Sequence, residues 1–222
     1  MYKLTKMALN KKNLTNLFYI FIASHLIIWT LVPALTNNNL PLDTIEHLAW
    51  GSNLDWGFNK HPPMVAFVLE IFYQIFGAND WAYYLLSQIF VIISFIVVFK
   101  LAEEFFKNKV FSLLSVLLLE GIYFYNFTTP EFNVNVCLMP FWALSVLFLW
   151  RGFKDNKTTD WLLMGLFGGL GFMSKYLFIY LGLAIDLFII YMVYKNKFNF
   201  NFKPLISIIP FFIVLLPHLI WL

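Results

Sequence analysis

Cysteine and charge are both scarce in this sequence, and each scarcity removes a class of protein. The 222 residues include one cysteine, Cys137, so neither a disulfide framework nor a thiolate metal cluster can form within the chain. We interpret Cys137 as a small apolar helix residue. Only 12% of the residues are charged, about half the usual share of a soluble domain, whereas 61% are apolar. This composition excludes an ordinary soluble protein.

The chain also lacks the patterns that mark many enzymes and nucleic-acid-binding proteins. No Walker loop, dinucleotide-binding glycine pattern, H-E-x-x-H or G-x-S-x-G motif occurs, so nucleotide hydrolysis, dinucleotide chemistry and the common hydrolase mechanisms have no support. The net charge is +3, and the basic residues lie in short separate groups rather than in one continuous patch. We therefore expect no nucleic-acid partner.

Long apolar runs are what the sequence has in abundance. A helix needs about 20 apolar residues to cross a hydrocarbon core of about 30 Å, and the runs are too long and unbroken for the alternating strands of a barrel. They predict an all-α, polytopic transmembrane protein with about seven spans. The spans are expected at residues 17–35, 81–100, 110–126, 133–150, 161–174, 176–194 and 204–222.

Residues 161–194 are too long for one span, because a single helix of 34 residues would measure about 51 Å. We therefore place a reversal at Ser174-Lys175-Tyr176, with a short helix on each side. Four glycines would let the first of these helices pack closely on a neighbour. They are Gly165, Gly168, Gly169 and Gly171.

The distribution of lysine and arginine predicts the orientation of the chain. With the N-terminus in the cytoplasm, 13 of the 15 basic residues fall on the cytoplasmic side, as the positive-inside rule requires. The two exceptions are Lys60 and Lys175. The residues predicted to be cytoplasmic are Lys3, Lys6, Lys11, Lys12, Lys100, Lys107, Lys109, Arg151, Lys154, Lys157, Lys195, Lys197 and Lys203.

The first outer loop, residues 36–80, is the only long extramembrane segment that the sequence predicts. We expect two juxtamembrane helices in it, at 43–56 and 63–76, separated by two prolines. The second is apolar but only about 14 residues long, which suits an interfacial or re-entrant helix better than a span. The acids expected on the outer side are Asp43, Glu46, Asp55, Glu70, Asp80 and Glu131.

Four of these outer residues could carry chemistry. Asp43 and Glu46 are spaced i and i+3, which places both carboxylates on one face of a helix start. The same spacing fits a capping box, with Asp43 as the N-cap and Glu46 as its partner. Glu131 lies in a short outer turn, either as a solvated loop acid or as a further site carboxylate. Lys175 either extends to the lipid headgroups or binds a lipid phosphate.

Several short motifs, in the same order along the chain, resemble segments of bacterial family-39-type glycosyltransferases. These enzymes have many spans and the C-type glycosyltransferase fold, and they are similar to protein O-mannosyltransferases and to the aminoarabinose transferases that modify lipid A. The resemblance covers residues 17–222. It rests on Asp43-Thr44-Ile45-Glu46, Leu54-Asp55-Trp56-Gly57-Phe58, His61-Pro62-Pro63-Met64, Thr129-Pro130-Glu131-Phe132-Asn133, the glycine-rich run that ends in Ser174-Lys175-Tyr176, and Pro217-His218-Leu219-Ile220-Trp221.

The resemblance implies transfer of a sugar from a polyprenyl-phosphate carrier at the outer face of the cell inner membrane. The acceptor would be lipid A, another glycan or a protein, and membrane lipid surrounds the site. Asp43 matches the position of the family's catalytic acid, where it would act as a general base. The family often has two adjacent acids there, whereas Thr44 follows Asp43 in this chain and Glu46 is the next acid.

The same resemblance implies roles for other residues. Glu131 would be the second carboxylate, and Lys175 with Lys60 would neutralise the departing lipid phosphate. His61 either assists them or shapes the turn, and Tyr176 would complete the substrate-binding residues. A divalent metal between acids and phosphate is conceivable, but no ligand spacing demands one, so we assign no cofactor.

Two other hypotheses remain open from the sequence. A transporter or lipid flippase would line its pathway with Glu120, Asp186 and Lys175, although no internal repeat supports this reading. A non-catalytic membrane remnant would do no chemistry. The chain forms a single predicted transmembrane domain over 1–222, and we expect it to be the N-terminal part of a longer enzyme because it ends inside an apolar run.

Overall fold

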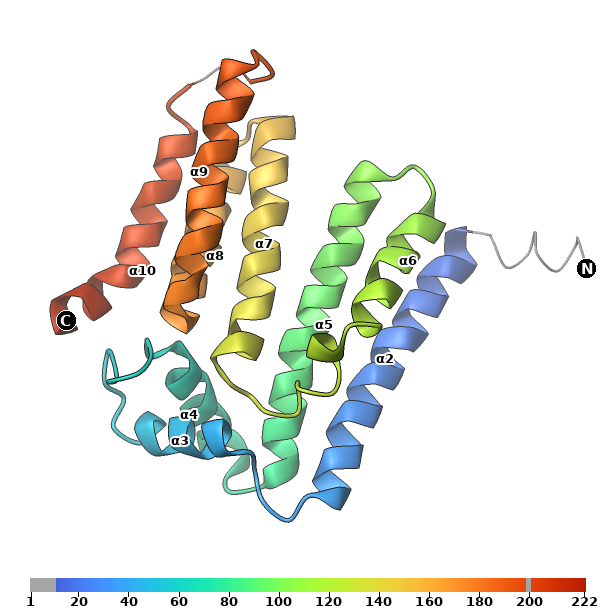
Figure 1. The fold of residues 1–222 in the computed structure, drawn as a ribbon, viewed down its shortest axis with the longest axis vertical. Coiled ribbons are helices and arrows are strands. Elements are labelled where there is room, and N and C mark those ends of the chain that lie inside the picture. Colours follow the sequence, from blue (N-terminus) through green and yellow to red (C-terminus); the bar gives the residue numbers. More distant parts are fainter. Residues whose placement is uncertain (1–10, 199–200) are drawn as a thin grey trace, which may run out of the picture.

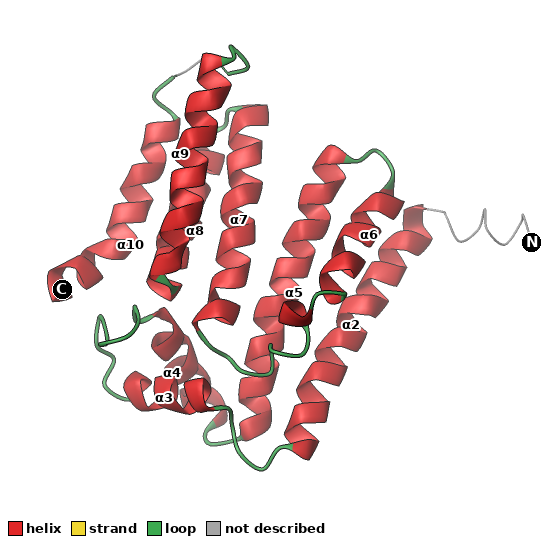
Figure 2. Ribbon diagram, in the orientation of Figure 1, coloured by secondary structure: helices red, strands yellow, loops and turns green. Residues whose placement is uncertain are grey.

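The computed structural model describes residues 11–198 and 201–222, and this part of the chain is helical without strands (Figure 2). The all-α prediction is therefore confirmed. The α-helices are α2 (Lys11–Thr36), α3 (Leu42–Gly51), α4 (Met64–Phe76), α5 (Asp80–Phe105), α6 (Lys109–Glu120), α7 (Val134–Asp155), α8 (Thr158–Ser174), α9 (Ile179–Tyr194) and α10 (Ile208–Trp221). Three short 3₁₀ helices are η1 (Tyr123–Tyr125), η2 (Tyr176–Phe178) and η3 (Pro204–Ser207).

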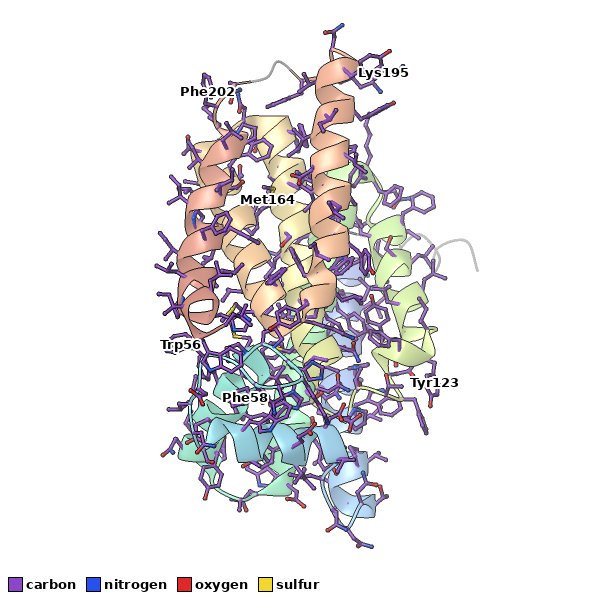
Figure 3. All side chains as sticks on the ribbon, turned by 60° about the vertical axis from the view of Figure 1, so that its left-hand side comes forward. Trp56, Phe58, Tyr123, Met164, Lys195 and Phe202 are labelled. Atoms are coloured by element: carbon purple, nitrogen blue, oxygen red, sulfur yellow. The ribbon has the colours of Figure 1, made fainter. Side chains whose placement is uncertain are left out.

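The long helices lie side by side, and α3 and α4 gather at one end of them (Figure 1). We call this the outer end; the chain also reaches it between α6 and α7. The opposite end, which we call the basic end, holds the turns after α5, α7 and α9. Figure 3 places Trp56 and Phe58 at the outer end and Lys195 and Phe202 at the basic end. Lys3 and Lys6, which were expected on the basic side, lie outside the described residues.

Five of the described helices are long and apolar enough to cross a membrane, so the protein is a polytopic membrane protein but the count of seven spans is not confirmed. The five are Lys12–Thr36, Asp80–Phe105, Val134–Asp155, Tyr176–Tyr194 and Pro204–Trp221. Helix α8 has 17 residues and measures about 26 Å. Helix α6 has 12 residues and measures about 18 Å, so the expected continuous span at 110–126 is wrong.

The chain leaves the helical path after α6 because polar side chains satisfy its backbone there. Asn126 donates its side-chain amide to the carbonyl of Glu120, and Ser87 donates its hydroxyl to the carbonyl of Thr129. Gln88 on α5 donates to the Thr129 hydroxyl at 3.2 Å. Irregular backbone at membrane depth requires such partners, since lipid offers none.

His25 connects this polar group to the first helix. Its Nε2 lies 3.1 Å from the Gln88 side-chain oxygen, and its Nδ1 lies 2.7 Å from a Glu120 carboxylate oxygen. The imidazole is almost completely buried, whereas about a third of the Glu120 side chain is exposed. The contacts join α2, α5, α6 and the segment that follows α6, so Glu120 has a structural role in the fold.

The reversal predicted at Lys175 is confirmed. Helix α8 ends at Ser174, Lys175 is extended, and η2 begins the return. The glycines of α8 do pack against a neighbour: a Cβ on Gly165 would lie 1.9 Å from the backbone oxygen of Ser207. A Cβ on Gly169 would lie 3.1 Å from the backbone oxygen of Phe211. This close approach positions α10 against α8.

The two juxtamembrane helices are present in the first outer loop. Helix α4 begins within one residue of its expected start, and its apolar face is buried through Val65, Ala66 and Leu69. Helix α3 ends at Gly51 instead of residue 56. After Gly51 the chain turns: the N–H groups of Asn53 and Leu54 donate to the carbonyls of Trp50 and Gly51, and Leu54 takes a left-handed backbone conformation with a φ of 49°. Gly51 itself packs against the backbone of α4, where a Cβ would lie 2.8 Å from the Ala66 oxygen.

Candidate active site

Asp43 and Glu131 meet at the outer end although 88 residues separate them. The backbone N–H of Asp43 donates to Oε1 of Glu131 at 3.1 Å. The N-cap of α3 is Pro41, which provides no side-chain acceptor. Glu131 therefore satisfies an N–H that the first turn of a helix leaves without an internal partner. The capping-box interpretation of Asp43 and Glu46 is wrong, because the cap comes from another segment.

Asn133 holds the Glu131 carboxylate from its other side. Its side-chain Nδ2 donates to Oε2 of Glu131 at 3.3 Å. Its Oδ1 accepts from the backbone N–H groups of Asn135 and Val136, at 2.9 and 3.3 Å, and so caps α7. The carboxylate thus lies near the first turns of both α3 and α7, where the positive ends of helix dipoles stabilise negative charge.

The carboxylate of Asp43 has no hydrogen bond or ion pair with the described part of the chain, although the side chain is half-buried. Both of its backbone groups are engaged: the N–H by Glu131 and the carbonyl by Nδ1 of His47, which donates to it at 2.6 Å. The backbone is therefore fixed while the carboxylate stays available to a substrate. This arrangement suits a general base better than a structural acid.

Two histidines line the same site. The rings of His47 and His61 are stacked with centroids 5.7 Å apart and planes 10° apart. Burial lowers the pKa of His47, against the opposing effect of its hydrogen bond to Asp43 and of the Asp43 and Glu46 charges. Burial also lowers the pKa of His61, assisted by His47 and Lys175 and opposed by Asp43 and Glu46. Both imidazoles therefore resist protonation more than free histidine does.

Lys175 brings a positive charge to the carboxylates. Its ammonium donates to Oδ1 of Asn135 in the first turn of α7 at 2.6 Å. Asn135 also lines a pocket of about 230 Å³ together with Glu131, Asn133, Phe124, Thr128 and Val136. We call this the polar pocket. Lys175 therefore lies beside a polar space next to Glu131, where an anion would find a cation.

Glu46 and Lys60 form an ion pair at the edge of the site. The Lys60 ammonium lies 2.6 Å from Oε1 of Glu46, and 60% of the Lys60 side chain is exposed. Exposed pairs of this kind contribute little to stability, so either group can exchange its partner for a substrate at small cost. Glu46 is engaged by a cation, whereas Asp43 is not.

Tyr176 lies in a different set of contacts from Lys175, although the two residues are adjacent. The Tyr176 hydroxyl lies 2.8 Å from Nε2 of His218, whose Nδ1 donates to the carbonyl of Trp56 at 2.6 Å. The neutral imidazole with its proton on Nδ1 fits both contacts, with the tyrosine as donor. Tyr176 and His218 thus fasten α10 to the first outer loop, and a role of Tyr176 in substrate binding stays a prediction.

Three residues of the site were not singled out from the sequence: Asn133, Asn135 and His47. Asn133 and Asn135 are the first and third residues of the span predicted at 133–150, and asparagine is a common helix cap. His47 follows Asp43 by four residues, one turn along the same helix face. These signals existed, but the side-chain contacts to Glu131 and Lys175 depend on segments that are distant in the sequence.

A metal site can be tested against the same geometry. Within residues 11–198 and 201–222, no three His, Cys, Asp or Glu side chains converge as ligands of one ion would. Asp43, Glu131, His47 and His61 therefore do not gather around a common centre.

Comparison with known proteins places this polytopic membrane protein among the glycosyltransferases. Residues 60–221 match the family model described as dolichyl-phosphate-mannose-protein mannosyltransferase, and the chain belongs to this family. The matched region contains Lys60, His61, Glu131 and Lys175, whereas Asp43 lies before it.

One curated relative supports the same assignment. The chain is 29% identical over 156 residues to the lipid A galacturonosyltransferase RgtD of Rhizobium johnstonii. The aligned region covers 67% of this chain and 32% of the relative. The chain therefore spans about a third of the length of that relative. No solved structure matches the chain. The family match favours a transferase over the transporter or flippase considered from the sequence.

Proposed function

We propose that the protein is a membrane glycosyltransferase that moves a sugar from a polyprenyl-phosphate donor to an acceptor at the outer face of the cell inner membrane. The acceptor class is lipid A, another glycan or a protein. The observation that carries the proposal is the unengaged carboxylate of Asp43, held beside Glu131 with Lys175 at the neighbouring pocket. The family supports the lipid-linked donor.

In the proposed reaction Asp43 acts as the general base, and Lys175 provides the positive charge for the leaving phosphate. The acceptor hydroxyl attacks the anomeric carbon of the sugar, and the Asp43 carboxylate takes up the hydroxyl proton. The bond between the anomeric carbon and the phosphate oxygen breaks, and the electron pair leaves with the polyprenyl phosphate. The Lys175 ammonium stabilises the charge on that phosphate, and Lys60 can join it by leaving Glu46. A general base contributes typically 10²–10⁴-fold.

The proposed orientation in the membrane rests on where the basic residues lie along the molecule. The outer end carries Asp43, Glu46, Asp55 and Glu131, and the described basic groups after α5, α7 and α9 lie at the opposite end. Under the positive-inside rule the basic end faces the cytoplasm. The N-terminus is then cytoplasmic, and the site lies where a lipid-linked sugar projects from the outer leaflet.

The test is transfer of a labelled sugar from polyprenyl phosphate in membranes that contain the protein. Asp43→Asn keeps the size of the side chain and removes the base, so we expect transfer to fall about 10²–10⁴-fold. The matched control is Asp55→Asn, an exposed acid of the same loop, which should transfer at the wild-type rate. Equal rates for Asp43→Asn and wild type, at equal protein levels, would show that Asp43 is not the base.

A further inference from the structure

Helix α9 carries an acid that the proposed reaction does not use. Asp186 lies in the middle of the candidate span Tyr176–Tyr194, at least about 12 Å from either end. The residue is exposed, and its carboxylate has no hydrogen bond or ion pair with residues 11–198 or 201–222. Acids inside membrane spans face the interior of a bundle and pair with another group, because lipid does not solvate their charge. Asp186 therefore lacks the partner that its depth in the membrane requires.

Asp186 lines a pocket of about 270 Å³ to which α7, α8, α9 and α10 contribute. We call this the α9 pocket. Figure 3 shows Met164, one of its lining residues, between α9 and α10. Three lining residues are exposed, namely Asp186, Ile208 and Phe212. The α9 pocket therefore opens on the side of the bundle, between two of the candidate spans.

The hydroxyl and carboxylate groups that line the α9 pocket have no proton to offer an occupant. The Ser145 hydroxyl already donates to the carbonyl of Phe141 at 2.7 Å, and the Ser207 hydroxyl donates to the carbonyl of Pro204 at 2.6 Å. The Asp186 carboxylate is an acceptor only. The pocket thus suits an occupant that donates hydrogen bonds and carries positive charge, which means an ammonium or a guanidinium group.

The surface around the α9 pocket can be approached closely by a helix. Gly182 and Asp186 lie one turn apart on the same face of α9. A Cβ on Gly182 would have no heavy atom within 4 Å, and such open glycines let a neighbouring helix contact the backbone. The flanking side chains are apolar and exposed, among them Leu183 on α9 and Phe212 on α10. An apolar helix with one basic side chain would match both the flanks and the carboxylate.

We propose that this face of α9 and α10 binds a transmembrane helix of a different polypeptide, whose lysine or arginine at mid-depth pairs with Asp186. In the described candidate spans of this chain, every lysine and arginine lies within five residues of a span end. His25 lies deeper, but Gln88 and Glu120 already engage its ring. The described part of a second copy therefore provides no free cation at the depth of Asp186.

Designed single-span polyleucine helices test the proposal without any sugar transfer. The intact chain, with a donor fluorophore on Lys197→Cys beyond the end of α9, is reconstituted in liposomes with an acceptor-labelled helix. The helix has lysine, leucine or aspartate at its centre. We expect the lysine helix to associate about tenfold more tightly than the leucine helix. Equal association of these two helices with the wild-type chain would overturn the proposal.

Substitutions of Asp186 identify the contact. Asp186→Asn keeps the size of the side chain and removes its charge, so the affinity for the lysine helix should fall about tenfold. Asp186→Lys should reverse the preference and bind the aspartate helix instead. The matched control is Asp155→Asn, an exposed acid outside the α9 pocket, which should bind like wild type. Unchanged binding of the lysine helix by Asp186→Asn would overturn the proposal, and this variant decides alone if Asp186→Lys does not accumulate.

Two further measurements distinguish the helix from other occupants. Donor-labelled and acceptor-labelled copies of the chain should show no energy transfer that depends on Asp186. Association of copies that Asp186→Asn abolishes would mean that a second copy covers this face, and would overturn the proposal. A single-chain alkylamine at the same membrane concentration should not displace the lysine helix. Complete displacement would show that the pocket accepts any membrane amine, which would also overturn the choice of a helix.

Discussion

The Glu131 carboxylate links two helices that the chain supplies from distant segments. One oxygen accepts the N–H of Asp43 on α3, and the other accepts the amide of Asn133, which caps α7. A single side chain therefore fixes the relative position of the Asp43 backbone and the start of α7. We therefore expect that replacing Glu131 would displace Asp43, the proposed base, although Asp43 itself is unchanged.

Individual residues were predictable by position but not by partner. The D-x-x-E spacing and the misplaced lysines drew attention to Asp43, Glu46, Lys60 and Lys175, and the structure brings all four to the outer end. The sequence could not show that Tyr176 would contact His218, because that contact depends on the packing of α10 against the outer loop. Local spacing carries no information of this kind.

Stability should depend on pH through His47. Its Nδ1 is bound to the Asp43 carbonyl, and its Nε2 is buried without a hydrogen-bond partner among the described residues, so protonation would bury an unpaired charge. The folded-state pKa is lowered from 6.5, so the unfolded chain binds more protons below that pH. The histidine therefore contributes its full stability above pH 6.5, and this contribution falls as the pH drops toward the folded-state pKa.

Thermal unfolding in nanodiscs between pH 8 and 5 measures this effect. Wild type should lose stability below about pH 6.5, by at most about 1.4 kcal/mol per pH unit for one histidine. His47→Asn keeps a donor for the Asp43 carbonyl and cannot titrate, so its curve should be flatter. Parallel curves for the two proteins would contradict the assignment of the pH dependence to His47.

At the scale of helices, the apolar runs predicted the long elements well, because burial in lipid requires continuous apolar sequence. The end of α6 was missed for a physical reason. Residues 121–126 are apolar and aromatic enough to continue a span. However, Asn126 donates its side-chain amide to the Glu120 carbonyl, and Ser87 and Gln88 on α5 bind Thr129. Whether the helix continues or ends after Glu120 thus depends on contacts with α5, which lies 30 or more residues earlier in the sequence. A hydropathy profile contains no information on such contacts.

Helix α8 depends on its glycines for contact with the last helix. Gly165→Ala would place a methyl group 1.9 Å from the Ser207 oxygen, which forces α10 to move, and we expect a loss of about 1–3 kcal/mol. The control is Gly182→Ala on α9, where no heavy atom lies within 4 Å of the new Cβ. That change should be neutral or stabilise by about 0.5–1 kcal/mol. Thermal unfolding of the two variants measures the difference, and equal melting temperatures would contradict the packing argument.

For the molecule as a whole, the separation of charge is the property that composition alone concealed. A net charge of +3 says little, but most of the described basic residues lie at one end of the bundle, where Glu103 and Glu104 pair with some of them, and the outer end carries Asp43 and Glu131. The fold class and this polarity were predictable because both follow from the bilayer. The number of complete spans could not be predicted, because it depends on how neighbouring helices cover the short helices α6 and α8.

The orientation of the chain in the membrane can be measured by cysteine labelling, because the native cysteine is buried and should not react. Cys137 is completely buried, with its thiol donating to the Ser174 hydroxyl at 3.3 Å. Asn53→Cys adds an exposed thiol at the outer end, and Lys197→Cys adds one at the basic end. A membrane-impermeant maleimide applied to intact cells or spheroplasts should label the first and spare the second until the membrane is permeabilised. The reverse pattern would show the opposite topology.

The hydrogen bond from His218 to the carbonyl of Trp56 joins residues 162 positions apart, so it can form only after both segments have been synthesised. The first outer loop leaves the ribosome well before the histidine that fastens it. Contacts so distant in sequence form late in folding. We therefore expect the segment with Lys60 and His61 to be fixed in place only after α10 has been inserted.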